Sequence, residues 1–250
     1  MPLPTPDDAM TDLAASHHHT VNHTAHRAIT DRGHADDVRT FGFDRLVRRA
    51  IVRSSARLRL TLSSGRPPSE RSFGALDRWF AGFAAEVRGH LELVQSGLLP
   101  RLGAREVLDE RGLEALAADH AWVDHLLSEL GDAIGVLGFD LGDAAQWVER
   151  ARSIADELDL VLAGVISREQ RTLVPMARAH LSAAELVELD KERRRDLVVR
   201  RVPFALAWLC ETLGDDVEAE VMAAVPGPAR LVYRTRRRAY ARTAATALVA

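Results

Sequence analysis

The chain has 250 residues, a formal net charge of −3 at pH 7 and one cysteine, and it is 47% hydrophobic, 28% charged and 5% aromatic. Its acidic and basic residues are interspersed, so the chain lacks the strongly positive electrostatic field that would attract the whole protein to nucleic acid. The lone Cys210 excludes an intramolecular disulfide. No apolar run reaches the roughly 18 to 20 residues of a membrane span, and no signal-peptide core is visible, so we expect a cytoplasmic protein. Abundant Ala, Leu, Arg and Glu predict an all-α chain.

The first 35 residues differ from the rest of the chain. Residues 1–35 show no apolar periodicity and contain six histidines, including the run His17, His18 and His19. A segment without regularly spaced apolar residues cannot bury a core, so we predict a disordered N-terminal tail. Its histidines can bind metal adventitiously, but a tail without a scaffold makes a poor dedicated metal site.

Residues 36–177 contain four segments with helical periodicity. Breakers separate the segments: SSGRPPSE at 63–70, LPRLG at 99–103 and a glycine-rich stretch near 135–142. In each segment, residues at alternating steps of three and four form one inner face. These faces consist of Phe43, Val47, Ala50 and Ser54 in the first segment; Leu76, Phe80, Phe83, Val87, His90, Val94 and Leu98 in the second; Leu113, Leu116, His120, Val123, Leu127, Leu130 and Ile134 in the third; and Trp147, Ala151, Ile154, Leu158, Leu162, Val165 and Glu169 in the fourth. Four long helices with short connections predict an up-down-up-down four-helix bundle.

Residues 178–250 are predicted to form a helical C-terminal extension packed on the bundle. The sequence SAAE at 182–185 is a capping box that begins a helix. Breakers at Pro203, at Gly214 and in PGP at 226–228 divide the rest into shorter helices. No pattern in this extension predicts a chemistry.

Two basic runs lie in the extension. They are KERRR at 191–195 and RTRRRAYAR at 234–242. Runs of this kind usually form solvated helix faces. We therefore expect neither a nucleic-acid nor a membrane partner.

Three polar residues occupy positions that their helices otherwise reserve for apolar side chains: His90, His120 and Glu169. Burying three such groups separately would cost a few kcal/mol each, so we predict that they converge in one cavity. Glu86 and Asp124 lie one turn from His90 and His120 and are expected at the surface. We do not include His125, because five residues correspond to about 140° around a helix.

Two stretches of the chain share one frame, HLELVQSGLLP at 90–100 and VISREQRTLVP at 165–175. Each has Gln five residues after its start and ends in Leu, an aliphatic residue and Pro. With a further His on the third segment, this frame resembles the hemerythrin-like (HHE cation-binding) family over residues 37–177. The segment 202–242 is similar to actinobacterial members of that family.

The resemblance implies a pair of iron atoms. In the family they are held by a His on the first helix, His-x3-Glu on the second, a His on the third and His-x3-Glu on the fourth, and serve oxygen, nitric oxide or iron-sensing chemistry. Half of these positions match and half are apolar here: His90, His120 and Glu169 are retained, whereas Phe43, Val94 and Val165 stand where ligands belong. Three side chains cannot fill the roughly ten coordination positions of two irons, so we expect no di-iron centre.

The lost ligands lead us to expect a central apolar pocket, lined by Phe43, Phe83, Val94, Val123 and Val165. The two histidines and Glu169 would converge on it as acid–base groups. Burial is expected to raise the pKa of Glu169, and a nearby imidazole would oppose that shift when protonated. The leading hypothesis is a metal-independent enzyme without a cofactor. It would cyclise, isomerise or dehydrate a small apolar organic molecule, for example in secondary metabolism.

Two alternatives stay open on the sequence. In the first, His90, His120 and Glu169 form the 2-His-1-carboxylate set of a mononuclear non-heme iron site for oxygen or nitric oxide chemistry. Glu86 or Asp124 would then supply an extra ligand. In the second, the bundle is a non-catalytic binding or regulatory protein whose buried polar groups satisfy one another.

Overall fold

The chain is all-helical in the residues that its computed structural model describes, namely 42–64, 70–137, 144–200 and 202–248; no strand occurs among them. The predicted tail over 1–35 lies outside these residues, as do most of the breaker at 63–70 and part of the one near 135–142. Residues 39–250 form one compact unit. No helix in the described ranges is both long and apolar enough to span a membrane.

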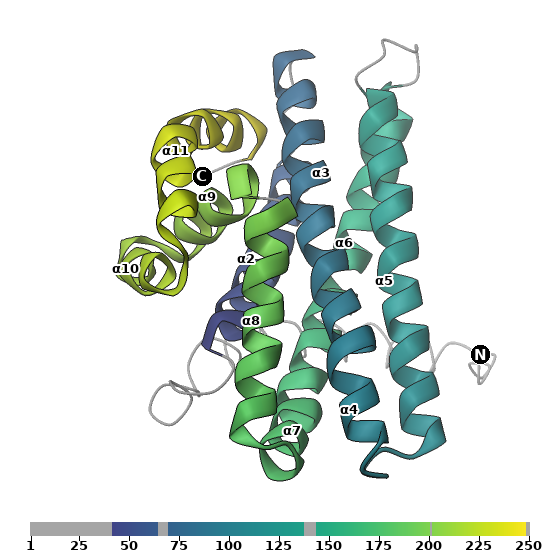
Figure 1. Cartoon of the computed structure of the whole chain (residues 1–250). Helices are drawn as coiled ribbons and strands as arrows, with labels where there is room; N and C mark the ends of the chain where they lie inside the picture. The colour runs from purple at the N-terminus through teal and green to yellow at the C-terminus, as the bar shows by residue number, and fades with distance from the viewer. Residues whose placement is uncertain (1–41, 65–69, 138–143, 201, 249–250) are drawn as a thin grey trace, which may run out of the picture. The chain divides into compact units, whose positions relative to one another are not determined.

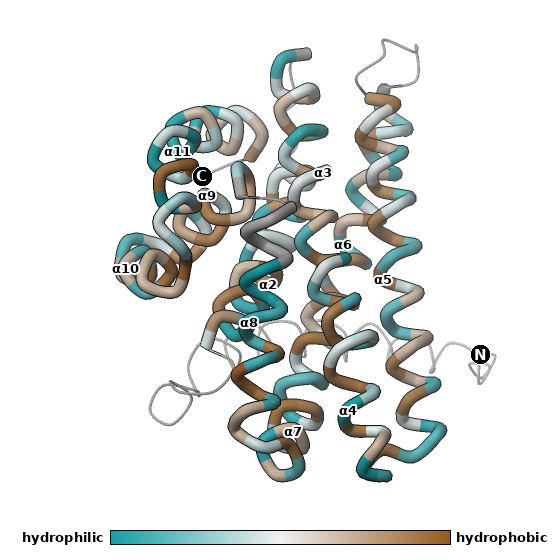
Figure 2. The backbone as a smooth tube through the Cα atoms, viewed as in Figure 1, coloured by the Kyte–Doolittle hydropathy of each residue, from teal (hydrophilic) through white to brown (hydrophobic). Residues whose placement is uncertain are grey.

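Four long helices carry the predicted inner faces: α2 (Gly42–Ser63), α3 (Glu70–Glu92), α5 (Glu110–Leu137) and α6 (Ala144–Arg168). Helices α2 and α5 each contact both α3 and α6 (Figure 1). Every residue of the predicted inner faces is buried except Leu113 and Trp147, which are partly buried. Figure 2 shows hydrophobic and hydrophilic residues alternating along these helices, the pattern that lets one stripe pack inward.

Helices α3 and α6 both continue into a π-helix and then into a short α-helix. Helix α3 leads into η1 (Leu93–Leu98) and α4 (Leu99–Gly103), and α6 leads into η2 (Glu169–Leu173) and α7 (Val174–His180). The predicted break at 99–103 is therefore wrong, because these residues are helical. Pro100 and Pro175 both lie at the start of the short helix, directly after the π-helix, and the helical backbone continues through each proline. The repeated sequence frame is thus a repeated local structure.

The C-terminal segment forms α8 (Ala183–Arg200), α9 (Val202–Leu213), α10 (Asp215–Ala224) and α11 (Gly227–Ala247). The predicted capping box is confirmed, since the backbone N–H of Glu185 donates to Ser182 Oγ and that of Ser182 donates to Glu185 Oε2 at 2.9 Å. Gly214 separates α9 from α10 with φ of 91°, a conformation that favours glycine.

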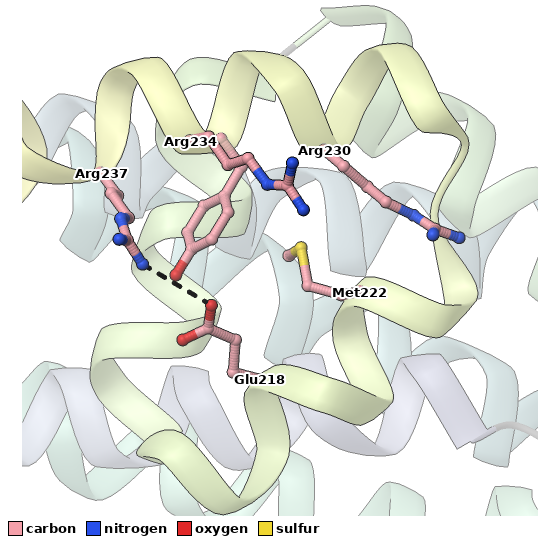
Figure 3. A pocket seen from close by; sticks show the side chains of 6 residues that line it. Glu218, Met222, Arg230, Arg234 and Arg237 are labelled. Carbon is pink, nitrogen blue, oxygen red and sulfur yellow. Dashed lines mark ion pairs between the residues drawn. The ribbon is translucent and has the colours of Figure 1, made fainter.

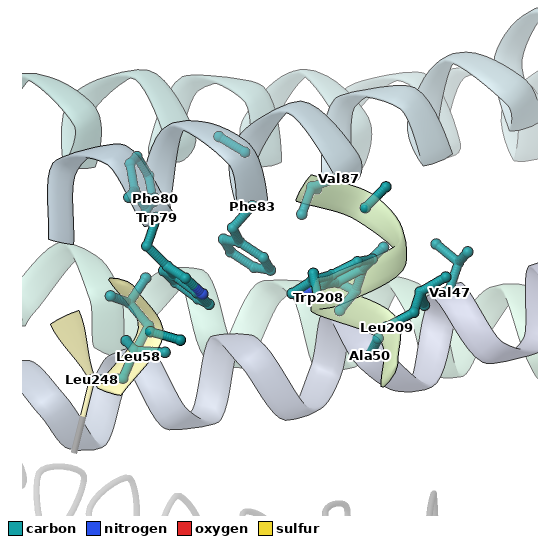
Figure 4. Close-up of a cluster of buried hydrophobic side chains, with 14 of the residues drawn as sticks. Val47, Ala50, Leu58, Trp79, Phe80, Phe83, Val87, Trp208, Leu209 and Leu248 are labelled. Atoms are coloured by element: carbon teal, nitrogen blue, oxygen red, sulfur yellow. The ribbon is translucent and has the colours of Figure 1, made fainter. Parts of the chain in front are cut away.

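Helix α9 packs on α2 and α3, and α11 packs on α3 and α9. Trp208 of α9 is fully buried, and its Nε1–H donates to Ser54 Oγ at 2.8 Å. Trp79 of α3 likewise donates to the Tyr240 hydroxyl of α11 at 3.0 Å. Figure 4 shows side chains of α3 and α9 gathered over α2 together with Leu248. One continuous apolar cluster therefore includes residues from both ends of the unit.

Candidate functional site

The structure brings His90, His120 and Glu169 together inside the protein. His90 lies in the last turn of α3, His120 in α5, and Glu169 is the first residue of η2. His90 Nε2 is 2.8 Å from Glu169 Oε2, and His120 Nε2 is 3.4 Å from Glu169 Oε1. All three side chains are no more than 2% exposed. One carboxylate thus faces two imidazoles.

Asp44 and Arg48 of α2 join this cluster, although the sequence pattern did not single them out. Asp44 Oδ1 is 3.3 Å from His90 Nδ1, on the side of the ring opposite Glu169, and Arg48 Nη2 is 2.7 Å from Asp44 Oδ2. Both side chains are buried. The sequence did contain an indication of this pair: Asp44 and Arg48 lie one helical turn apart, each next to an inner-face residue, Phe43 or Val47.

The first helix therefore differs from the expectation that centred on Phe43. Phe43 is buried in the apolar cluster, and the neighbouring Asp44 faces His90 instead. The backbone N–H of Phe43 donates to Asp190 Oδ1 of α8 at 3.3 Å, which ties the start of α2 to the C-terminal segment.

The basic run 191–195 is only partly a solvated face, contrary to prediction. Arg193 is 1% exposed, and its positive charge is one of those that lower the pKa of Asp44. Its neighbours match the prediction better, since Lys191 is exposed and Arg194 pairs with Asp190 on the same helix at 3.3 Å.

Of the flanking acids, one is exposed as predicted and one is not. Asp124 is exposed and pairs with Arg88 at 2.6 Å. Glu86 is fully buried, which corrects the expectation of a surface position. It lies one turn before His90 on the same helix, and neighbouring helices cover that turn. His125 is exposed and lies against the Trp122 ring, as its angular position on α5 predicts.

Electrostatic interactions set the protonation of His90. Burial disfavours the charged imidazolium, but Glu169 and Asp44 outweigh burial and raise the pKa of His90 to about 9. Burial would likewise raise the pKa of Asp44, yet Arg48, His90 and Arg193 hold it well below its usual range. At neutral pH His90 is therefore a cation next to an ionised Asp44.

Glu169 is also ionised, contrary to the expected rise in its pKa. Burial favours the neutral carboxylic acid, but His90, His120 and Arg48 lower the pKa of Glu169 to about 2. The expectation was wrong because the charge of His90 and the hydrogen bonds of both histidines outweigh burial, and Arg48 adds a smaller lowering of the pKa.

The five predicted pocket residues are all buried but do not share one cluster. Phe43, Phe83, Val123 and Val165 belong to the large apolar cluster, whereas Val94 belongs to a second one with residues of η1, α4, α5, α7 and α8. Val94 and Val165, the two valines at positions where the resemblance would place ligands, thus pack in different apolar surroundings.

The residues present do not fit the pair of irons that the resemblance implies. Within the described ranges, no group of three or more His, Cys, Asp or Glu side chains is arranged to hold a metal ion. Arg48 and His90 already place positive charge against the two carboxylates of Asp44 and Glu169. A buried guanidinium repels a cation that would share the same acids. The arrangement suits a fixed network of buried ion pairs.

Comparisons of the chain with protein-family models, with curated proteins and with solved structures find no match. The function must therefore be argued from the cluster of charged groups itself.

Proposed function

We propose that this chain is an up-down-up-down four-helix bundle of hemerythrin-like ancestry that works without a metal, as a binding or regulatory protein. In this proposal a fixed network of Asp44, Arg48, His90, His120 and Glu169 stands where the family holds iron. One observation carries it: the buried guanidinium of Arg48 lies 2.7 Å from Asp44, within the same charged cluster as His90 and Glu169.

The charges in this network balance without an added cation. Asp44 and Glu169 contribute two negative charges, and protonated His90 and Arg48 contribute two positive charges. A metal ligand at His90 must be neutral, so a metal would have to displace a proton that both carboxylates stabilise. It would also have to approach Arg48. Both costs favour the metal-free state.

The same network supports binding or regulation over catalysis. A general base must accept a proton near neutral pH, whereas His90, with a pKa of about 9, already carries one. Glu169, with a pKa of about 2, is a weak base at the same pH. Each group is buried, and His90 Nε2 and Glu169 Oε2 are hydrogen-bonded to each other at 2.8 Å.

Metal content of the full chain tests this proposal. Protein purified without chelator, then loaded with iron(II) and desalted, is compared with a His90→Gln variant treated in the same way. We expect wild type and variant to retain equal iron, because only the His-rich tail would bind it, and we expect EDTA to leave Tm unchanged. One iron per chain that disappears in His90→Gln, with a lower Tm in EDTA, would overturn the proposal in favour of the mononuclear iron site.

A second candidate is metal-independent acid–base chemistry on a small apolar organic molecule. It is favoured by His120, whose Nε2 lies at 3.4 Å from Glu169 Oε1 with apolar Val123 one turn further along α5. Such an enzyme must admit small molecules to His120. Modification of the full chain with diethyl pyrocarbonate, read by peptide mass spectrometry, compares His120 with the exposed His125. Modification of both at similar rates at an unchanged Tm would favour this candidate, and protection of His120 favours the closed network.

A further inference from the structure

A cavity lies between α10 and α11, on elements that do not contribute to the charged cluster. Its volume is about 330 Å³, and Glu218, Met222, Arg230, Tyr233, Arg234 and Arg237 line it. Figure 3 shows the arginines projecting from α11 and Met222 and Glu218 projecting from α10. A volume of this size is at the lower end of the range for small-molecule sites.

The lining residues from α11 belong to one helix face. Arg230, Tyr233, Arg234 and Arg237 are spaced by three, four and seven residues, which places them on the same side of the helix. Glu218 and Met222 are four residues apart on α10 and form the facing wall. Regular helix geometry, rather than a loop, therefore holds these groups in place.

Positive charge dominates the cavity. Three guanidinium groups face one carboxylate, and Glu218 lies 3.9 Å from Arg237, at the limit of an ion pair. Arg230 is oriented by a hydrogen bond from its Nε to the Val225 carbonyl at 3.0 Å. Arg234 forms no ion pair with any other residue that the structure describes. A guanidinium next to a concave surface is suited to bidentate binding of a carboxylate, sulfonate or phosphate.

Apolar groups form the rest of the wall. Tyr233 is buried and Met222 partly buried, and Met222 packs against the large apolar cluster of the protein. An inorganic anion would leave this apolar surface in contact with water, whereas a ligand with an apolar body would cover it.

We propose that this cavity binds a small organic anion, with its carboxylate, sulfonate or phosphate group at Arg234 and Arg230 and its apolar body against Met222 and Tyr233. Glu218 disfavours a polyanion such as nucleic acid, because a carboxylate in the wall repels a continuous phosphate backbone. This inference does not depend on the role of the buried network, since the two sites share no residue.

The test uses 8-anilinonaphthalene-1-sulfonate, an aromatic sulfonate, in a fluorescence titration of the full chain. We expect saturable binding of one molecule per chain, weakened at least tenfold by Arg234→Gln. The matched control is Arg236→Gln, which removes another exposed arginine of α11 that does not line the cavity, and it should leave binding unchanged. Glu218→Gln should strengthen binding, because it removes the repelling carboxylate.

Further probes separate this proposal from simpler kinds of binding. Inorganic phosphate and the uncharged N-phenyl-1-naphthylamine should each bind at least tenfold more weakly than the aromatic sulfonate, since each lacks one half of the ligand. Equal loss of binding in Arg234→Gln and Arg236→Gln would overturn the proposal. So would tight binding of duplex DNA that both variants weaken alike, which would identify a general polyanion surface instead.

Discussion

His90 joins two ionised carboxylates inside the protein, and the protonation of this one residue sets the charge of the cluster. Its Nε2 lies 2.8 Å from Glu169 Oε2 and its Nδ1 lies 3.3 Å from Asp44 Oδ1, so each ring nitrogen faces a carboxylate. The arrangement explains why burial fails to neutralise the imidazole: two nearby negative charges outweigh the loss of solvation. Removal of any one of these charges leaves the buried cluster with an unbalanced charge.

A raised pKa in the folded state makes stability depend on pH in a defined direction. The contribution of His90 is fully present below its ordinary pKa of 6.5 and is lost as pH rises through about 9. We expect the free energy of unfolding of wild type, relative to a His90→Gln variant, to fall by about 3 kcal/mol at most across that window. Urea unfolding at several pH values measures the difference. A constant difference between pH 6 and pH 9.5 would contradict a protonated His90.

Glu169 acts at the opposite end of the pH scale. Its pKa is lowered from 4.5 to about 2, so its contribution is present above about pH 4.5 and is lost as pH falls through about 2. We expect acid unfolding of wild type to begin below about pH 4.5 and to be less steep in Glu169→Gln. Circular dichroism during an acid titration measures the onset and the steepness of unfolding in both proteins. An identical acid transition in both proteins would mean that Glu169 is not held ionised by its neighbours.

Arg48 tests the balance of charge most directly. Arg48→Met keeps the unbranched apolar stem of the side chain but leaves Asp44 buried without its closest cation, so we expect a loss of about 3 kcal/mol in the free energy of unfolding. The double variant Asp44→Asn, Arg48→Met should lose much less than the sum of the single changes, because the unpaired charge is gone. Urea unfolding of wild type, Asp44→Asn, Arg48→Met and the double variant measures these losses in the free energy of unfolding. Additive losses would show that the two groups do not interact.

At the scale of helices, the close approach of α3 and α9 depends on a residue without a side chain. A Cβ atom at Gly82 of α3 would overlap the Phe204 ring of α9. That ring is held by stacking on Trp208 and by an edge contact with Tyr240. Gly82 thus permits the contact through which the C-terminal helices cover α3.

Two glycine substitutions should therefore have effects of opposite sign. We expect Gly82→Ala to lower the free energy of unfolding by about 1 to 3 kcal/mol, because the Phe204 ring must move in a packed interface. Gly164→Ala is the matched control, since an added Cβ on α6 meets no atom within 4 Å and alanine favours the helix. It should raise stability by about 0.5 to 1 kcal/mol. A stabilising Gly82→Ala would show that α9 does not pack closely on α3.

At the scale of the whole unit, the C-terminal helices complete the core that the four long helices begin. Trp208 is fully buried between α9 and α2, and the same apolar cluster continues through Tyr240 and Leu248. Side chains of the C-terminal helices are consequently part of the same hydrophobic core as those of the four long helices. The C-terminal helices α10 and α11 also line the cavity described above.

Substitution of one buried and one exposed tryptophan tests how much the C-terminal helices contribute to stability. We expect Trp208→Ala to lower the free energy of unfolding by about 3 to 5 kcal/mol, because it leaves a large cavity and removes the donor to Ser54. Trp122→Ala, which removes an exposed side chain of α5, should cost less than about 1 kcal/mol. Thermal and urea unfolding compare the two. Similar small losses in both variants would mean that the protein folds without the C-terminal helices.

The sequence by itself determined the helical class, most helix limits and the inner faces, because these follow from local spacing. A stripe of residues at steps of three and four can be recognised within one helix, without knowing which helix packs against it. For this reason the predicted buried positions of Phe83, Leu158 and the polar His90 were all correct. The capping box at Ser182 is local in the same sense. The break expected at 99–103 failed, because a proline that appears to end a helix can also begin the next turn of one.

Only the tertiary structure decided which charges meet. Asp44 and Glu86 resemble ordinary surface acids along the sequence, and their burial depends on helices that cover them from distant parts of the chain. The pKa of Glu169 falls because His90 and Arg48, from two other helices, lie close to it. Electrostatic interaction depends on distance in space and not on spacing along the chain, so a periodic pattern can indicate that a polar residue lies inside but not what neutralises it.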